Sequence, residues 1–250
     1  IMKISLLTCI AIGLFGMVLY FKNSNPYYDP NKAHHTSTGF KNPYLKQDNQ
    51  SKSFSDLFKM MTTKRPNPKP QIAKNLSIDS MIQKIDNNKS FITWVGHSTM
   101  LLHINSKTIL TDPIFSDRCS PVQFLGPKRY SFPTIDIELL PKIDLIVISH
   151  NHYDHLDKNS VKILGKDSST VWYVPLGLKK WFDKLNIKNV IELDWFQEGK
   201  LDNVEIICLP SQHWSKRSLF KSFDTLWSSW SLKVGNFKFW FAGDTGYNKI

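Results

Sequence analysis

The chain has 250 residues and a net charge of +11, with 41% hydrophobic and 21% charged residues. These values are globular and exclude an intrinsically disordered chain; the length allows one sizeable core, or a modest domain with appendages. The basic balance favours an anionic partner such as a membrane surface, a nucleic acid or a phosphate-bearing substrate. Lysines spread over a surface for solubility would give the same charge.

The first predicted element is the uncharged stretch "ISLLTCIAIGLFGMVLYF" at residues 4–21, which just reaches the length that crosses a bilayer as a helix. The residues after it offer no cleavage site for a secretory signal, so we expect residues 1–22 to form an uncleaved membrane anchor. Lysines recur after this stretch, whereas only Lys3 precedes it. This bias predicts a membrane-associated protein whose catalytic part faces the cytoplasm.

Residues 23–75 are rich in Asn, Lys, Pro and Ser and end in "KRPNPKP". The prolines at 66, 68 and 70 exclude a helix there and favour an extended, solvated linker. The remaining residues, 76–250, form the predicted catalytic domain.

Short strand-like runs alternate with helical spacing from about residue 90. Residues 143–149, "IDLIVIS", form a continuous apolar run of the length of a buried strand. Helical spacing appears at 158–164 and at 176–185. Strands that alternate with helices predict an α/β layer architecture. The other predicted strands are 91–95, 100–104, 107–112, 171–174, 190–194, 204–210, 228–234 and 237–243.

Histidine and aspartate concentrate in "SHNHYDHLD", residues 149–157, directly behind the buried strand. An extended H-x-H places the two imidazoles of His150 and His152 on the same side, as two ligands of one metal site require. A turn then directs Asp154 and His155 elsewhere, where they can serve a second ion. Nitrogen and carboxylate ligands without sulfur suit zinc, with iron or manganese as alternatives.

Two later strand ends supply further candidate ligands, His213 in "PSQHW" and Asp244 in "FAGDTGY". A lone histidine or aspartate at a strand end is usually a solvated turn residue. Together with the H-x-H-x-D-H loop these positions would converge on one edge of a sheet, and a carboxylate such as Asp244 can bridge two ions. His97 in "GHST" is expected to be structural, and "DP" at 112–113 to be a turn.

A pair of divalent cations at such an edge supplies Lewis acidity and activates water at neutral pH. The chemistry indicated is therefore hydrolysis of a phosphodiester, an acyl bond or a lactone. The sequence contains no G-x-S-x-G nucleophile motif and no glycine-rich phosphate loop that would favour another mechanism.

The H-x-H-x-D-H loop resembles the signature of the metallo-β-lactamase superfamily. Within that superfamily the chain is similar to the N-acyl-phosphatidylethanolamine-hydrolysing phospholipases D, from about residue 90 to residue 247. The likeness is carried, in order and with matching spacing, by "WVGHSTMLL", "LTDPIFSDRCSPVQFLGPKRY", "ISHNHYDHLDKNS", "WYVPLGLKKW", "VIELDWF", "PSQHWSKRSL" and "FWFAGDTGY".

The resemblance implies a metallo-β-lactamase-like αβ/βα sandwich with two zinc ions between its sheets. It implies hydrolysis of N-acyl-phosphatidylethanolamine to an N-acylethanolamine and phosphatidic acid by a membrane-associated homodimer. Gln123 and Phe124 would contact the phospholipid, and Asp154 and Asp244 would be the catalytic carboxylates. In the family pattern one zinc is held by His150, His152 and His213, the other by Asp154 and His155, and Asp244 bridges the two. The family's remaining zinc-binding histidine would follow Ile250, and we expect the sequence to be C-terminally truncated.

Two other classes of function compete with this interpretation. The first is a different hydrolase on the same scaffold, a lactonase or an RNA-processing nuclease. The sequence has no RNA-binding module and no stripe of clustered lysines, and a nuclease has little use for a bilayer anchor, so we expect no nucleic-acid partner. The second is a non-catalytic, membrane-tethered protein, which would be expected to have lost some of the six candidate ligands.

Overall fold

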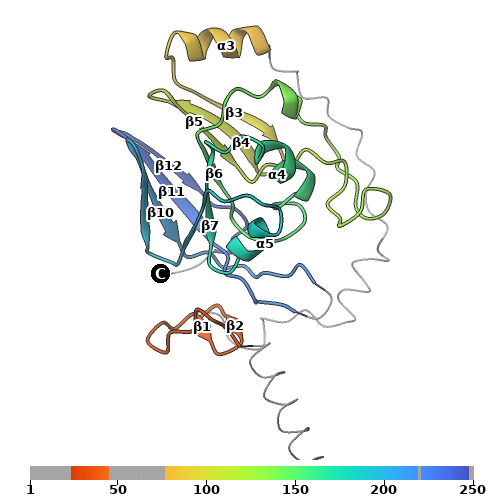
Figure 1. Ribbon diagram of the computed structural model, residues 1–250, viewed down its shortest axis with the longest axis vertical. Helices are drawn as coiled ribbons and strands as arrows, with labels where there is room; N and C mark the ends of the chain where they lie inside the picture. Colours follow the sequence, from red (N-terminus) through yellow and green to blue (C-terminus); the bar gives the residue numbers. More distant parts are fainter. Residues whose placement is uncertain (1–23, 45–62, 64–76, 219–220, 248–250) are drawn as a thin grey trace, which may run out of the picture.

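The computed structural model describes residues 24–44, 63, 77–218 and 221–247. The predicted anchor and most of the predicted linker lie outside these residues. Within the described ranges, no helix combines the length and the apolar character needed to cross a membrane. Two sheets, several helices and a small N-terminal hairpin make up this part of the chain (Figure 1).

The first sheet has six strands and carries the helices. Strands β3, β4 and β5 are antiparallel, whereas β5 to β8 run parallel. Parallel neighbours need a crossover connection, and α4 and α5 supply two of them. In sheet order the strands are β3 (Phe91–Gly96), β4 (Thr99–Ile104), β5 (Lys107–Thr111), β6 (Leu145–Val147), β7 (Val171–Pro175) and β8 (Val190–Leu193), and the helices are α4 (Lys158–Leu164) and α5 (Lys179–Asp183).

The second sheet is antiparallel and has four strands in the order β12-β11-β10-β9. Its strands are β9 (Glu198–Leu201), β10 (Val204–Leu209), β11 (Ser229–Val234) and β12 (Phe237–Phe241). The other described elements are the hairpin strands β1 (His35–Thr36) and β2 (Gly39–Phe40), helix α3 (Ile78–Asp86) and a 3₁₀ turn at Ile137–Leu139.

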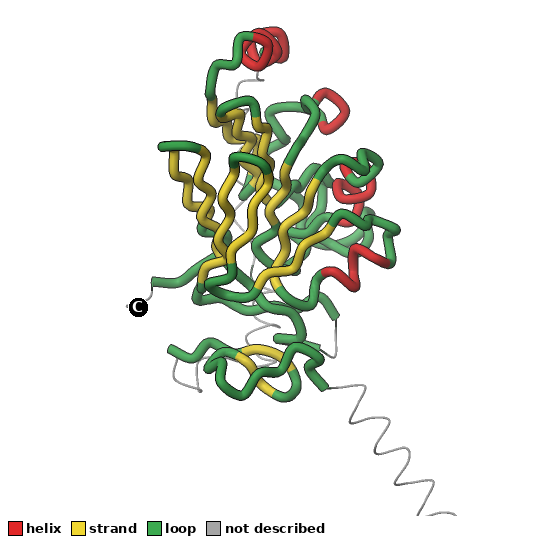
Figure 2. Tube along the Cα trace, turned by 60° about the vertical axis from the view of Figure 1, so that its left-hand side comes forward, coloured by secondary structure: helices red, strands yellow, loops and turns green. Residues whose placement is uncertain are grey.

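Strand β6 shows how the layers are built from the sequence. Leu145 and Val147 belong to the core between the two sheets, whereas Ile146 and Ile148 belong to the core under the helices. All four side chains are fully buried. A strand covered on both faces reads as a continuous apolar run, which is why "IDLIVIS" shows no alternation. Helices α4 and α5 lie to one side of the strands, whereas α3 lies above their upper end (Figures 1 and 2).

Each of the nine predicted strands is present, and the α/β architecture is confirmed. The helix predicted at 176–185 is shorter, because a turn closed by Leu178 N–H on Pro175 O takes up its first residues. Helix α3 and strand β9, which the sequence does not predict, also belong to the domain.

Residues 24–44 are the described part of the predicted linker, and they are folded against the domain. Strands β1 and β2 pair antiparallel, and the segment lies at one end of the sheets, below them in Figures 1 and 2. Several of its polar side chains bond to residues of the domain. Part of the segment is therefore buried, although its composition predicts a solvated linker. The buried residues of the segment are Asn25, His34, His35, Phe40 and Asn42, together with Gly39.

Candidate metal centre

The loop after β6 starts from a fixed point at the junction of the two sheets. The Ser149 N–H donates to Asp112 Oδ1 at 2.7 Å. From the second sheet, the Ser228 N–H donates to Ser149 O at 2.9 Å, and the Trp230 indole N–H donates to Ile148 O at 2.9 Å. His150, the next residue, is therefore attached to both sheets through its neighbours.

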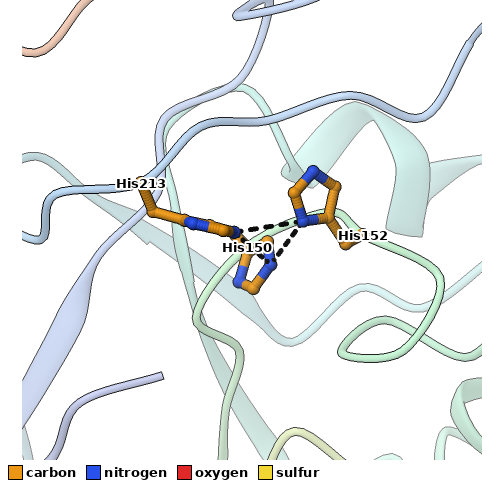
Figure 3. Close-up of side chains that lie close together, drawn as sticks. All are labelled: His150, His152 and His213. Carbon is orange, nitrogen blue, oxygen red and sulfur yellow. Dashed lines mark hydrogen bonds between the residues drawn. The ribbon is translucent and has the colours of Figure 1, made fainter. Parts of the chain in front are cut away.

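Three imidazole rings meet directly beyond this point. His150 Nε2 lies 2.8 Å from His152 Nδ1, and His213 Nε2 lies 3.2 Å and 3.1 Å from those two atoms (Figure 3). His213 comes from the loop between β10 and β11, about sixty residues further along the chain. The predicted convergence of His150, His152 and His213 is thus present in the structure.

The geometry of these three nitrogens fits a zinc-sized cation. Zinc–imidazole distances of about 2.0–2.1 Å in tetrahedral geometry imply nitrogen–nitrogen separations of about 3.3 Å. Burial lowers the pKa of His150 well below its usual value. Burial, together with the nearby His213, lowers the pKa of His152 to about 4. Both rings are therefore neutral at pH 7, as imidazole ligands must be.

Asp244 reaches the cluster from the end of β12. The preceding residue, Gly243, has φ +56° and packs so closely that a Cβ built on it would lie 2.5 Å from Ser149 Cβ. Asp244 Oδ1 lies 3.3 Å from His155 Nε2, and its Oδ2 lies 3.7 Å from His213 Nε2. One carboxylate thus spans the three-histidine cluster and the neighbouring His155, the arrangement expected of a bridging ligand.

A second group of side chains surrounds His155. Asp154 Oδ2 lies 4.0 Å from His155 Nε2 and 3.5 Å from His97 Nε2. Although we expect His97 to be structural from the sequence, it lies beside the candidate ligands with its side chain half exposed. It sits in the β3–β4 turn at φ +50°, and the Trp94 indole N–H donates to its carbonyl. Its only sequence signal is the "GHST" turn.

The charges of this second group favour a cation. Burial opposes protonation of His155, but the hydrogen bond with Asp112 and the nearby Asp244 carboxylate outweigh it and raise the pKa of His155 to about 10. Burial likewise opposes ionisation of Asp154, but His97 and His155 hold the pKa of Asp154 well below its usual range. His155 Nε2 is buried and forms no hydrogen bond of good geometry with any described residue. A metal ion would displace the proton that the raised pKa places on this nitrogen, and it would then satisfy the nitrogen and the two carboxylates together.

Asp112 connects the two groups, a role that the sequence does not predict. It is fully buried, and its Oδ2 accepts from His155 Nδ1 at 2.7 Å and from the Ser149 hydroxyl. That hydroxyl in turn accepts from His150 Nδ1 at 2.9 Å. With their protons on Nδ1, both rings turn Nε2 towards the candidate metal positions. The turn predicted at 112–113 thus carries a buried carboxylate that orients two histidines.

Replacing Asp112 with asparagine is expected to weaken metal binding about 10- to 100-fold, the usual cost of losing an outer hydrogen-bond partner of a metal ligand. An amide is a poorer acceptor and can present its NH₂ group to His155 Nδ1. Elemental analysis of the variant after dialysis against a weak chelator measures the effect. Wild-type metal content would contradict the orienting role of Asp112.

Arg217 joins the H-x-H-x-D-H loop to the loop that carries His213. Its guanidinium donates to Asn151 O and Leu156 O at 2.9 and 2.7 Å, between the rings of Tyr153 and Trp181. A cavity of about 860 Å³ adjoins these residues. The residues that give it a basic lining are Lys180, Lys184, Arg217 and Lys221, with Asp224 as the acidic residue.

The predicted lipid contacts lie in the loop between β5 and β6. Gln123 is engaged within that loop, because its amide both accepts from Arg118 N–H and donates to Arg118 O. Phe124 is 83% exposed, and its neighbour Leu125 is 67% exposed. The loop thus presents apolar side chains to solvent, while the role of Gln123 and Phe124 in binding lipid stays a prediction.

Comparison with known families assigns the chain to a class. Residues 107–249 match the model of a family described as the beta-lactamase superfamily domain. This match covers more than half of the chain, so the chain belongs to that family. Its layers of helices and two sheets are those of the metallo-β-lactamase fold, which confirms the fold class expected from the sequence.

This chain covers only part of the length of its individual relatives. The chain is 41% identical over 172 residues to an uncharacterized protein of Mycobacterium tuberculosis, covering 67% of this chain and 45% of the relative. It is 41% identical to N-acyl-phosphatidylethanolamine-hydrolyzing phospholipase D 1 of Caenorhabditis elegans, covering 63% and 47%. It is 37% identical to the mitochondrial N-acyl-phosphatidylethanolamine-hydrolyzing phospholipase D of Saccharomyces cerevisiae, covering 72% and 40%. The chain spans less than half the length of each of these three relatives.

Proposed function

We propose that the chain carries the metal centre of a zinc-dependent phosphodiesterase of the phospholipase D type. The reaction is hydrolysis of N-acyl-phosphatidylethanolamine to an N-acylethanolamine and phosphatidic acid. The observation that carries the proposal is that ring nitrogens of His150, His152 and His213 lie within 3.2 Å of one another. Beside them, the Asp244 carboxylate lies between His213 and His155. Two relatives named for this activity, at 41% and 37% identity, support the choice of substrate.

Each candidate residue has a role in this proposal. His150, His152 and His213 would hold one zinc, Asp154 and His155 the other, and Asp244 would bridge them. When bound, such a pair of cations supplies Lewis acidity and activates water at neutral pH. Asp154 and Asp244 are the proposed catalytic carboxylates: both side chains are more than 40% exposed, so their oxygens can accept hydrogen bonds from a water molecule that approaches the centre.

We also propose that the substrate is met at a membrane surface on the cytoplasmic side, with residues 1–22 as the anchor and a homodimer as the working form. The exposed Phe124 and Leu125 support this, because aromatic and apolar side chains bury favourably at the lipid interface. Gln123 and Phe124 would contact the phospholipid. The excess of 32 Lys and Arg over 21 Asp and Glu attracts anionic lipid, and the basic cavity beside Arg217 suits a phosphate-bearing substrate. No nucleic-acid partner is proposed.

Metal removal gives the direct test. Full chain treated with a strong chelator is expected to release no N-acylethanolamine from vesicles that contain labelled N-acyl-phosphatidylethanolamine, because neither cation is then present to activate water. Added Zn²⁺ should restore the release, with about two zinc ions bound per chain. The products are followed by chromatography and the zinc by elemental analysis.

Two outcomes of this assay would contradict the proposal. Release that survives complete metal removal would exclude a metal-dependent mechanism. A zinc-loaded chain that leaves the lipid intact but hydrolyses a lactone or an RNA would retain the metal centre and replace the substrate.

A further inference from the structure

The N-terminal segment 24–44 is fastened to the domain around one buried carboxylate. Asp194, at the end of β8, is 1% exposed. Its Oδ2 lies 2.5 Å from Lys32 Nζ and 3.0 Å from His35 Nε2. Its Oδ1 lies 2.7 Å from His34 Nε2. We refer to Lys32, His34, His35 and Asp194 as the Asp194 clamp.

The composition of the clamp resembles a metal site, but its contacts are those of an ion-pair cluster. The Lys32 ammonium already occupies Asp194 Oδ2 and would repel a cation there. The other oxygen accepts from Trp195 N–H at 2.8 Å as well as from His34. The His34 ring stacks on Trp195 at a centroid distance of 4.3 Å. N–H donors and a lysine thus bond to both oxygens of the Asp194 carboxylate, and the clamp holds the N-terminal segment to the domain.

From the clamp the segment runs to the loop that carries His213. The Phe40 N–H donates to Phe223 O at 2.8 Å. The approach is so close that a Cβ on Gly39 would lie 2.1 Å from the same oxygen, so only glycine fits. Asn42, which is 5% exposed, then donates from Nδ2 to the backbone carbonyl of His213 at 2.6 Å. The segment therefore contacts the candidate metal centre at the backbone carbonyl oxygen of His213.

The contact with Asn42 is one of several that hold the loop carrying His213. His150 and His152 leave β6 directly, and their loop is bonded to Asp112 and to both sheets. His213 lies in a long connection between β10 and β11 whose described residues contain no helix or named strand. Hydrogen bonds hold this connection on both sides of His213, from Gly246 N–H to Gln212 O and from Lys216 N–H to Asn151 Oδ1, and Asn42 bonds to His213 itself. The position of its backbone decides whether Nε2 meets the other two rings.

We propose that residues 24–44 are a positioning element of the metal centre. Asn42 fixes the backbone of His213, and the Asp194 clamp holds the segment so that Asn42 can do so. The inference rests on the proposed function in one respect, the role of His213 as a metal ligand. Asn42 is a positioning residue, because it acts on the metal through His213.

The test compares Asn42→Ala with Asn31→Ala in the full chain. Asn31 lies in the same segment but is exposed, and its side chain bonds only to Asp29 among the described residues. Zinc affinity is measured by competition with a chromophoric chelator, and hydrogen exchange of residues 211–215 by mass spectrometry. We expect Asn42→Ala to bind zinc about tenfold more weakly and to exchange faster at 211–215. Asn31→Ala should match the wild type in both.

A double variant, His34→Ala with His35→Ala, keeps Asn42 and loosens the clamp; it should shift both readouts in the same direction. Far-UV circular dichroism identifies any variant that fails to fold, in which case the other variant decides. His213→Ala serves as the reference. If it weakens zinc binding while the folded Asn42 and clamp variants match the wild type, the positioning role is wrong and the metal site stands. If His213→Ala itself binds zinc as the wild type does, the metal assignment and the positioning role both fall.

Discussion

Replacing His152 with alanine is expected to lower N-acylethanolamine release by about three orders of magnitude or more. His152 Nδ1 lies 2.8 and 3.1 Å from the other two ring nitrogens, so its loss removes one of the three proposed histidine ligands of the first cation. The cation supplies several kcal/mol of transition-state stabilisation, and each 1.36 kcal/mol is worth about tenfold in rate. The measurement is kcat/KM on lipid vesicles together with zinc content.

His103→Ala is the matched control for this experiment. His103 is also a buried histidine, but it lies on β4, bonds to the Thr108 hydroxyl at 3.0 Å and stacks on Phe91. Its loss should reduce stability and leave the zinc content of the folded protein unchanged. If His152→Ala released N-acylethanolamine at the wild-type rate, the metal-dependent mechanism would be wrong.

Removing the Asp194 carboxylate should lower the stability of the folded chain more than any other substitution proposed for it. Asp194→Ala is expected to lower the free energy of unfolding by about 3 kcal/mol, the lower end for breaking a buried ion pair. The lower end applies because Lys32 is about a third exposed and can turn to water. Urea denaturation measures the effect. Asp202→Ala is the control: its pair with Lys107 is exposed and should contribute less than about 1 kcal/mol.

The stabilisation by Asp194 should be lost at low pH. Burial opposes ionisation of Asp194, but hydrogen bonds from His34 and Lys32 outweigh it and hold the pKa of Asp194 below its usual value of 3.8. A carboxyl with a lowered pKa in the folded state stabilises fully above its unfolded pKa and loses that contribution as the pH falls below it. The difference between wild type and Asp194→Ala should therefore narrow below a pH of about 4. A constant difference down to pH 2 would contradict this account.

The sequence predicted the part of the site that lies at strand ends. An apolar run of strand length followed directly by polar residues indicates where a buried strand ends, and such ends share an edge of the sheet. His150, His152, Asp154 and His155 follow such a strand end, and His213 and Asp244 follow strand ends of the second sheet. The structure places all six close together.

Other parts of the site depend on contacts that no local pattern records. Asp112 acts on His155, 43 residues away, and Asn42 on His213, 171 residues away. His97 reaches Asp154 through a turn with positive φ, where the side-chain direction follows from the backbone rather than from residue type. Residues 24–44 are polar, and hydrogen bonds and ion pairs hold them more than apolar periodicity does. Composition therefore indicated a solvated linker.

The close approach of Gly243 to Ser149 has a consequence for the spacing of the two proposed cations. Ser149 immediately precedes His150, and Gly243 immediately precedes Asp244, so the Gly243 backbone packs against the Ser149 side chain one residue before each of these side chains. This packing sets a lower limit to the distance between the two segments that carry His150 and Asp244. A contact of this kind opposes closer approach of the two halves, so the centre should select metal ions by the separation they tolerate as well as by the donors they prefer.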